Sequence, residues 1–79
     1  MPQLPEDDAW LQERRRAIGD RIRIERLRQD RTQEDVFLTA RMGRKTYQDV
    51  EAGAVDARIT TLLRIAYVLG VHVTDLLHG

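Results

Sequence analysis

Five side chains able to make hydrogen bonds lie close together in the stretch RKTYQDVE, which begins at residue 44. They are Arg44, Lys45, Thr46, Gln48 and Asp49. Their cationic, hydroxyl, carboxamide and carboxylate groups can both donate and accept hydrogen bonds. At helical spacing Tyr47 and Val50 fall on the opposite side, one turn apart. The pattern predicts a short helix whose polar face suits a flat polar ligand, and the major groove of DNA is the natural candidate.

The chemistry of these five side chains matches the edges of base pairs. Arg44 and Lys45 can donate to guanine O6 and N7, the commonest specific contact in the major groove. Gln48 can pair with adenine, and Asp49 can accept from cytosine N4 although it would repel phosphate. Thr46 can touch a thymine methyl group or a phosphate.

The element that must position this face is a pair of short helices over residues 32–53. Val36 and Ala40 lie one turn apart in the first helix, and Tyr47 and Val50 repeat that spacing in the second. Together they form an inward apolar seam. We therefore interpret Tyr47 as a core residue and not as a base-stacking residue.

The motif around these helices resembles the Cro and phage-repressor class of helix-turn-helix proteins, which are XRE-like transcriptional regulators. That class begins Thr/Ser-Gln-Glu and closes Glu-x-Gly, and this chain has TQE at residues 32–34 and EAG at residues 51–53. The likeness runs from about Ile18 to Leu77, with the flanking helices in the expected order. It implies an all-α, compact five-helix, lambda-repressor-like DNA-binding domain with an N-terminal helical extension.

The resemblance also implies roles for single residues. The recognition helix would lie at about 44–52. Gln33 matches a glutamine that reaches a DNA phosphate and braces that helix, and Arg58 lies in a loop that follows the sugar-phosphate backbone in related proteins. Arg26 matches an arginine that pairs with the glutamate ending the recognition helix, here Glu51. We interpret this pair as structural.

Five positions depart from the pattern of the class, and the first is Arg31, which stands where an apolar residue is common. Phe37 stands where a small alanine lets the two helices approach, so either the helices are spaced differently or the ring turns to the edge of the core. Asp30 and Arg41 stand where glycine is frequent. Gly43 replaces a small polar cap, and we expect it to restore the turn by accepting a dihedral angle closed to other residues.

Capping residues and periodicity predict the first two helices. Acidic residues 6–8 favour a helix that starts there, and Ile18, Ile22 and Leu27 mark its buried stripe. Thr32 is a good N-cap for the next helix, because its hydroxyl can accept from a backbone amide.

The last two helices follow from the same signals. One is predicted to begin near Thr60 and to end at Gly70, and Thr74 is expected to cap a final short helix. The apolar stripe of the longer helix comprises Ile59, Leu62, Leu63, Ala66 and Leu69.

Apolar residues near both ends suggest contacts between subunits. The C-terminal group is more than one final turn can cover internally, which favours a two-fold contact. It comprises Leu76, Leu77 and Val71 or Val73. Trp10 and Leu11 either pack on the surface of their own domain or take part in a dimer contact.

The net charge of zero hides an uneven distribution. Residues 10–31 contain eight arginines against four acids, whereas residues 1–9 are acidic and contain no base. The run Arg14–Arg16 has two interpretations. It forms a phosphate-contacting patch, or a solvated face paired with Glu13 and Asp20 at helical spacing.

Length and composition exclude several classes of protein. Seventy-nine residues allow one domain, which we divide into an extension at 1–16 and a helix-turn-helix domain at 17–79. Because there is no cysteine, and His72 and His78 are isolated, we expect no disulfide, no metal site and no cofactor. No nucleophile, histidine–acid pair or phosphate loop indicates an enzyme.

The chain lacks an apolar run of about 18 residues and a signal peptide, which predicts a cytoplasmic protein, nucleoid-associated when bound to DNA. The first functional hypothesis is a regulator, such as a repressor, that binds double-stranded DNA as a homodimer on a pseudo-palindromic operator. The alternative is a protein-interaction module or antitoxin-like component that uses the fold mainly as scaffold and binds a protein partner.

Overall fold

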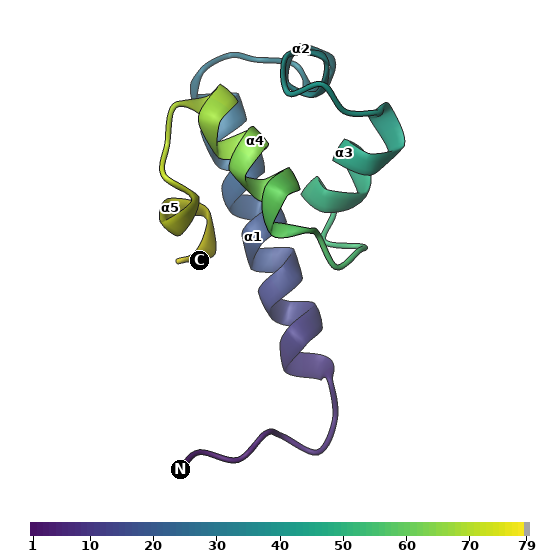
Figure 1. The fold of residues 1–79 in the computed structure, drawn as a ribbon, viewed down its shortest axis with the longest axis vertical. Coiled ribbons are helices and arrows are strands. Elements are labelled where there is room, and N and C mark those ends of the chain that lie inside the picture. The colour runs from purple at the N-terminus through teal and green to yellow at the C-terminus, as the bar shows by residue number, and fades with distance from the viewer. Residues whose placement is uncertain (79) are drawn as a thin grey trace.

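The computed structural model describes residues 1–78, so Gly79, the last residue of the expected domain, lies outside the described residues. Those residues form five helices, which confirms the all-α prediction. The helices are α1 (Ala9–Arg28), α2 (Gln33–Thr39), α3 (Arg44–Glu51), α4 (Ile59–Leu69) and α5 (Val73–Leu77). Figure 1 shows α1 as a long central helix whose first turns extend beyond the other four.

Each helix contributes one completely buried side chain to a common core. These are Ile22 from α1, Val36 from α2, Tyr47 from α3, Ile65 from α4 and Leu76 from α5, all 0% exposed. The prediction that Tyr47 belongs to the core is therefore confirmed. Because even the short α5 fills part of this core, the five helices form one packed unit.

Three apolar residues that we predicted to be buried are exposed. Leu27, Ile59 and Leu63 are about half exposed, because they lie on the outer sides of α1 and α4. On α1 the neighbouring inward positions hold the charged residues Glu25 and Arg26, both of which are buried. At the C-terminal end Leu76 is buried, since α5 packs against both α1 and α4, whereas Leu77 is 37% exposed, so the apolar group there is not fully covered.

The start of α2 and the end of α4 agree with the predicted caps. The Thr32 Oγ1 atom accepts from the backbone N–H of Asp35 at 3.0 Å. Gly70 takes the left-handed conformation, with φ 71°, directly after α4.

Two other helix starts differ from prediction. Helix α1 begins at Ala9, after residues 6–8, and runs unbroken across the expected boundary between residues 16 and 17. Thr74 lies inside α5, and the N-cap is His72, whose backbone N–H donates to Asp75 Oδ2 at 3.0 Å. The carboxylate of Asp75 provides the cap that we expected from the hydroxyl of Thr74.

The bend between α2 and α3 is made by Arg41, and the role predicted for Gly43 was wrong. Arg41 has φ 58°, in the left-handed region that favours glycine, and Asp30 has φ 54° after α1. Gly43 is extended, with φ −73° and ψ 157°, which any residue adopts. Both sites where glycine is customary therefore keep the left-handed geometry without glycine, at a cost of about 1–2 kcal/mol each.

Phe37 is buried between the two helices of the motif. Its ring is 5% exposed and lies 6.3 Å, centroid to centroid, from the ring of Tyr47. The guanidinium carbon of Arg44 lies 5.1 Å from the centroid of the same ring. The large side chain thus fills the end of the core next to the start of α3.

Candidate nucleic-acid interface

Helix α3 is held close to α1 by two glycines. A Cβ atom on Gly19 would collide with the backbone oxygen of Glu51. A Cβ atom on Gly53 would lie 2.7 Å from Arg16 Cα, and Gly53 has φ 70°. The Gln12 side chain also donates to the Gly53 oxygen at 3.1 Å. The backbone at the end of α3 is therefore placed directly against α1.

An ion pair between Arg26 and Glu51 joins the same two helices. Arg26 Nη2 donates to Glu51 Oε1 at 2.8 Å, and Arg26 Nε donates to Oε2 at 3.1 Å. Both residues are buried, at 8% and 7% exposure. Burial raises the pKa of the Glu51 carboxyl, but hydrogen bonds to Arg26, Tyr47 and Gln33, together with the positive charge of Arg26, outweigh this effect and hold the pKa below its usual range.

Two glutamines continue this hydrogen-bond chain to the surface. Gln33 Nε2 donates to Glu51 Oε1 at 3.2 Å, and Gln48 Nε2 donates to Gln33 Oε1 at 3.2 Å. Gln33 begins α2, and Gln48 lies on the exposed side of α3. The side chain of Gln33 therefore bridges the buried ion pair and the outer face of α3.

The structure brings the five base-reading candidates together on α3. Arg44, Lys45, Thr46 and Gln48 are exposed, and Asp49 is half-buried. Lys45 Nζ lies 3.1 Å from Asp49 Oδ2, and Arg44 Nη2 lies 3.7 Å from a carboxylate oxygen of Glu34. Because these pairs are open to water they hold their partners weakly and leave them available for exchange.

Arg58 lies on one flank of α3. It is exposed and directly precedes α4, and with Thr46 and Asp56 it lines a hollow of about 340 Å³. This hollow extends along the connection between α3 and α4, which is the loop assigned to the phosphate backbone by resemblance. The structure thus places Arg58 beside the outer face of α3.

The three arginines of the run Arg14–Arg16 do not act as one patch. Arg14 Nη2 donates to the Leu77 oxygen at 2.8 Å, and Arg15 Nη2 donates to Gln12 Oε1 at 3.1 Å. Arg16 instead lines a hollow that also contains Gln33 and Gln48. Sequence reasoning missed Arg23, which borders the same hollow two helical turns further along the same face of α1. Its spacing of seven residues from Arg16 was the signal.

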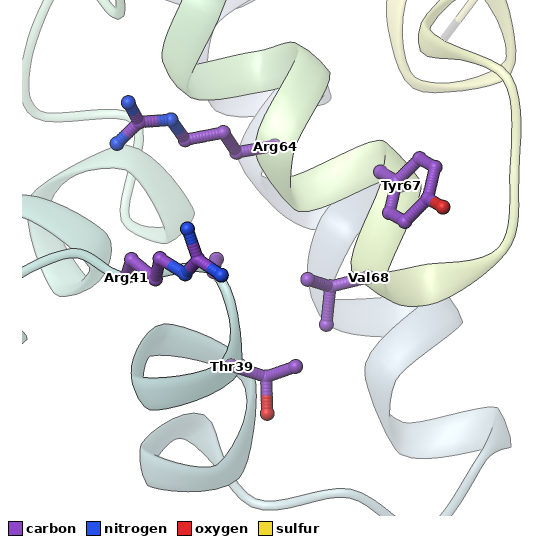
Figure 2. A pocket seen from close by; sticks show the side chains of 6 residues that line it. Thr39, Arg41, Arg64, Tyr67 and Val68 are labelled. Carbon is purple, nitrogen blue, oxygen red and sulfur yellow. The ribbon is translucent and has the colours of Figure 1, made fainter.

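A further hollow of about 290 Å³ lies between the end of α2 and α4 (Figure 2). Its lining residues include Arg41, Arg64 and Tyr67, and none belongs to α3. Among the described residues no group of histidines and acids has the arrangement of a metal site. No helix in residues 1–78 combines the length and apolar character that crossing a membrane requires.

Comparison with known proteins gives one match. The sequence model described as helix-turn-helix matches residues 22–76, a range that includes all of α2, α3 and α4. The first thirteen residues of α1, from Ala9 to Arg21, precede the matched range. No curated protein and no solved structure matches the chain significantly.

Proposed function

The chain belongs to the helix-turn-helix family of the Cro and phage-repressor type, a family of DNA-binding domains, and from this we propose a sequence-specific transcriptional regulator. In this proposal the protein binds a pseudo-palindromic operator as a homodimer and represses transcription by occupying it. Helix α3 enters the major groove, where its outer side chains meet base edges.

The observation that carries the proposal is the contrast between the two sides of α3. The inner side is anchored by the buried Arg26–Glu51 pair, and the outer side presents Arg44, Lys45 and Gln48 to solvent. An anchored helix holds such side chains at fixed angles, so they do not have to be ordered when DNA binds. This arrangement favours recognition of a defined sequence.

Phosphate contacts are available on both flanks of α3. Thr46 and Gln48, which border the two hollows, project about 160° apart around the helix. Arg58 lies on the Thr46 side, and Gln33 lies on the Gln48 side. A major groove about 12 Å wide has a phosphate backbone on each edge, so one candidate can face each strand.

An exposed apolar stripe on α4 supports dimerisation. Ile59, Leu63 and Tyr67 follow one another at intervals of four residues and are 56%, 48% and 88% exposed. The stripe begins directly after Arg58, so it runs away from the proposed DNA side along one face of α4. In the proposed dimer, a two-fold contact through this stripe would let both α3 helices bind the same duplex. The sequence suggested the C-terminal leucines as the dimer contact. Because Leu76 is buried, we propose the α4 stripe in its place.

A protein-interaction role is the second candidate. The pairing of Lys45 with Asp49 reduces the positive charge of the outer face, and the acidic residues 6–8 are all exposed. In that case the acidic segment or the α4 stripe contacts a protein such as a toxin. This role leaves the exposed side chains of Arg44, Gln48 and Arg58 without a ligand.

Selection of bound sequences from a random duplex library distinguishes the two candidates. A regulator yields an enriched pseudo-palindrome with half-sites about 10 base pairs apart and strong salt dependence. Arg44→Ala should weaken binding to the selected site by about 1–3 kcal/mol and relax one base position, while Arg58→Ala should reduce the salt slope by about 1.

Arg64→Ala is the matched control, because it removes the same charge from a hollow that no α3 residue borders. Failure to enrich any sequence, with only weak binding at low salt, would favour the protein-interaction role. Equal binding by the wild type and the Arg44 variant would show that α3 is not the reading helix. Sedimentation of wild type and Leu63→Glu tests the proposed dimer contact independently of DNA.

A further inference from the structure

We propose that Arg16 and Arg23, here called the α1 arginine pair, bind the phosphate backbone of DNA and extend the interface onto α1. The inference rests on the proposed function and names a contact that the helix-turn-helix motif does not contain. Arg16 lies in the part of α1 that precedes the residues matched by the family, and Arg23 lies inside the matched range.

The α1 arginine pair borders the recognition helix directly. A hollow of about 380 Å³ is lined on one side by Arg16, Asp20 and Arg23 of α1, and on the other by Gln33 and Gln48. The hollow is therefore continuous with the phosphate candidate at the start of α2 and with the outer face of α3. An anion placed against Gln33 lies next to the arginine pair.

The two arginines can reach different phosphates. They are seven residues apart, which is two helical turns, so they point from the same face of α1 about 10 Å apart along its axis. A single strand of the duplex carries one charge about every 3.4 Å of helix axis. The pair therefore matches a backbone segment better than it matches a single small anion.

Neither guanidinium is neutralised within the protein. The side chains of Arg16 and Arg23 are both exposed. Among residues 1–78 neither has an ion-pair or hydrogen-bond partner. Other arginines of the first helix and the turn after it are engaged by carboxylates. The pairs are Arg21–Glu25, Arg26–Glu51, Arg28–Glu25 and Arg31–Asp35. Unpaired cations beside the reading face favour an anionic ligand.

Asp20 is the opposing charge in the hollow. It lies four residues from Arg16, but no oxygen of its carboxylate comes within ion-pair distance of either arginine. Glu51, which also lines the hollow, is neutralised by Arg26. The hollow keeps a net positive charge, and Asp20 reduces its attraction for phosphate.

The position of Arg16 is set by the backbone. The close approach of Gly53 to Arg16 Cα, together with the bond from Gln12 to the Gly53 oxygen, places this turn of α1 against the end of α3. The first part of α1 therefore moves with the reading face. Arg58 stands on the opposite flank of α3, so phosphates on both edges of one groove are accounted for.

The test measures the salt dependence of binding to the selected duplex. Each of Arg16→Ala and Arg23→Ala should lower the salt slope by about 0.9, and at about 0.15 M salt this loss corresponds to roughly fivefold weaker binding. The double variant should show both losses with unchanged base preference. Asp20→Asn should bind more tightly than wild type, and Arg16→Lys should keep the slope.

Arg64→Ala again serves as the matched control, and its slope should equal that of the wild type. A double Arg16/Arg23 variant that keeps the wild-type slope would overturn the inference while leaving the proposed function intact. If the wild type selects no site, the result contradicts the proposed function, and the proposed contact of the α1 arginine pair is contradicted with it. Circular dichroism of the variants checks that α1 remains folded.

Discussion

Two of the ion pairs made by helix α3 differ in almost every physical respect. Arg26–Glu51 connects α3 to α1, and its side chains are 10% and 5% exposed. Lys45–Asp49 lies within α3, and its side chains are 87% and 30% exposed. The first has two hydrogen bonds and a further bond from Arg26 to the Arg31 oxygen, whereas the second has one contact.

The difference separates a structural pair from an exchangeable one. A buried charge that loses its partner stays buried and uncompensated, so the pair must remain intact for the fold to hold. An exposed pair is screened by water and salt, so its partners can be replaced by bases or phosphates at little cost. The same helix therefore combines a fixed inner side with an adaptable outer side.

The largest expected effect comes from removing one partner of the buried pair. Glu51→Ala should lower the free energy of unfolding by about 3–5 kcal/mol, because Arg26 is left buried without its carboxylate. Urea denaturation followed by circular dichroism measures this change. Replacing both partners, as in Arg26→Met with Glu51→Leu, should recover much of the loss. A Glu51→Ala variant as stable as the wild type would contradict the conclusion that Arg26–Glu51 is a structural pair and Lys45–Asp49 an exchangeable one.

Close packing behind α3 should be almost as sensitive. Gly19→Ala should cost about 1–3 kcal/mol, because the added methyl group meets the Glu51 backbone oxygen and one helix must shift. Thermal denaturation of this variant can be compared with Gly43→Ser, at the exposed start of α3. A Cβ atom added to Gly43 would meet no other described residue within 4 Å apart from the chain neighbours, and a serine N-cap should be neutral or stabilising by a few tenths of a kcal/mol. Equal effects at the two glycines would contradict this contrast.

The buried pair should also show in the pH dependence of stability. Because the pKa of Glu51 is lowered in the folded state, its contribution is present above the unfolded value of about 4.3 and is lost as the pH falls through the folded pKa. The stability difference between wild type and Glu51→Gln should therefore be constant at neutral pH and shrink below about pH 4.3. A difference that does not change down to pH 2 would show that the pKa is not lowered.

The smallest expected effect belongs to the exposed pair. A double-mutant cycle with Lys45→Ala and Asp49→Ala should give a coupling free energy of about 0.3–0.5 kcal/mol, reduced further at high salt. The same variants measured with the selected duplex should differ from each other, because Lys45 attracts DNA and Asp49 repels its phosphates. A coupling above about 1 kcal/mol would place this pair among the structural ones.

Periodicity and capping predicted the fold well where one local interaction decides. Thr32 and Gly70 act as expected, since each cap depends on a few neighbouring atoms. Predictions failed where a distant element decides. Leu63 was predicted to be buried but is exposed, because none of the helices in residues 1–78 covers that side of α4.

The outer face of α3 shows the same division. The spacing of Arg44, Lys45 and Gln48 was enough to place them on one side of a helix, and the structure has them there. The partners of Arg44 and Gln48 lie in other parts of the chain, whereas Lys45 pairs with Asp49 on the same helix. Gln48 receives its partner from α2, and Arg44 lies over Phe37, so these contacts required the angle between two helices.

The sequence by itself determined the five helices, the inward position of Tyr47 and the family, because these depend on local periodicity and on motif spacing. Only the tertiary structure decided that Arg16 and Arg23 share a hollow with Gln33, and that the arginine run divides among three different partners and surfaces. The physical reason is that helical periodicity sets which residues share a face of a helix, and this periodicity does not depend on what packs against that face. Which face meets the core, another subunit or solvent depends on how the helices pack.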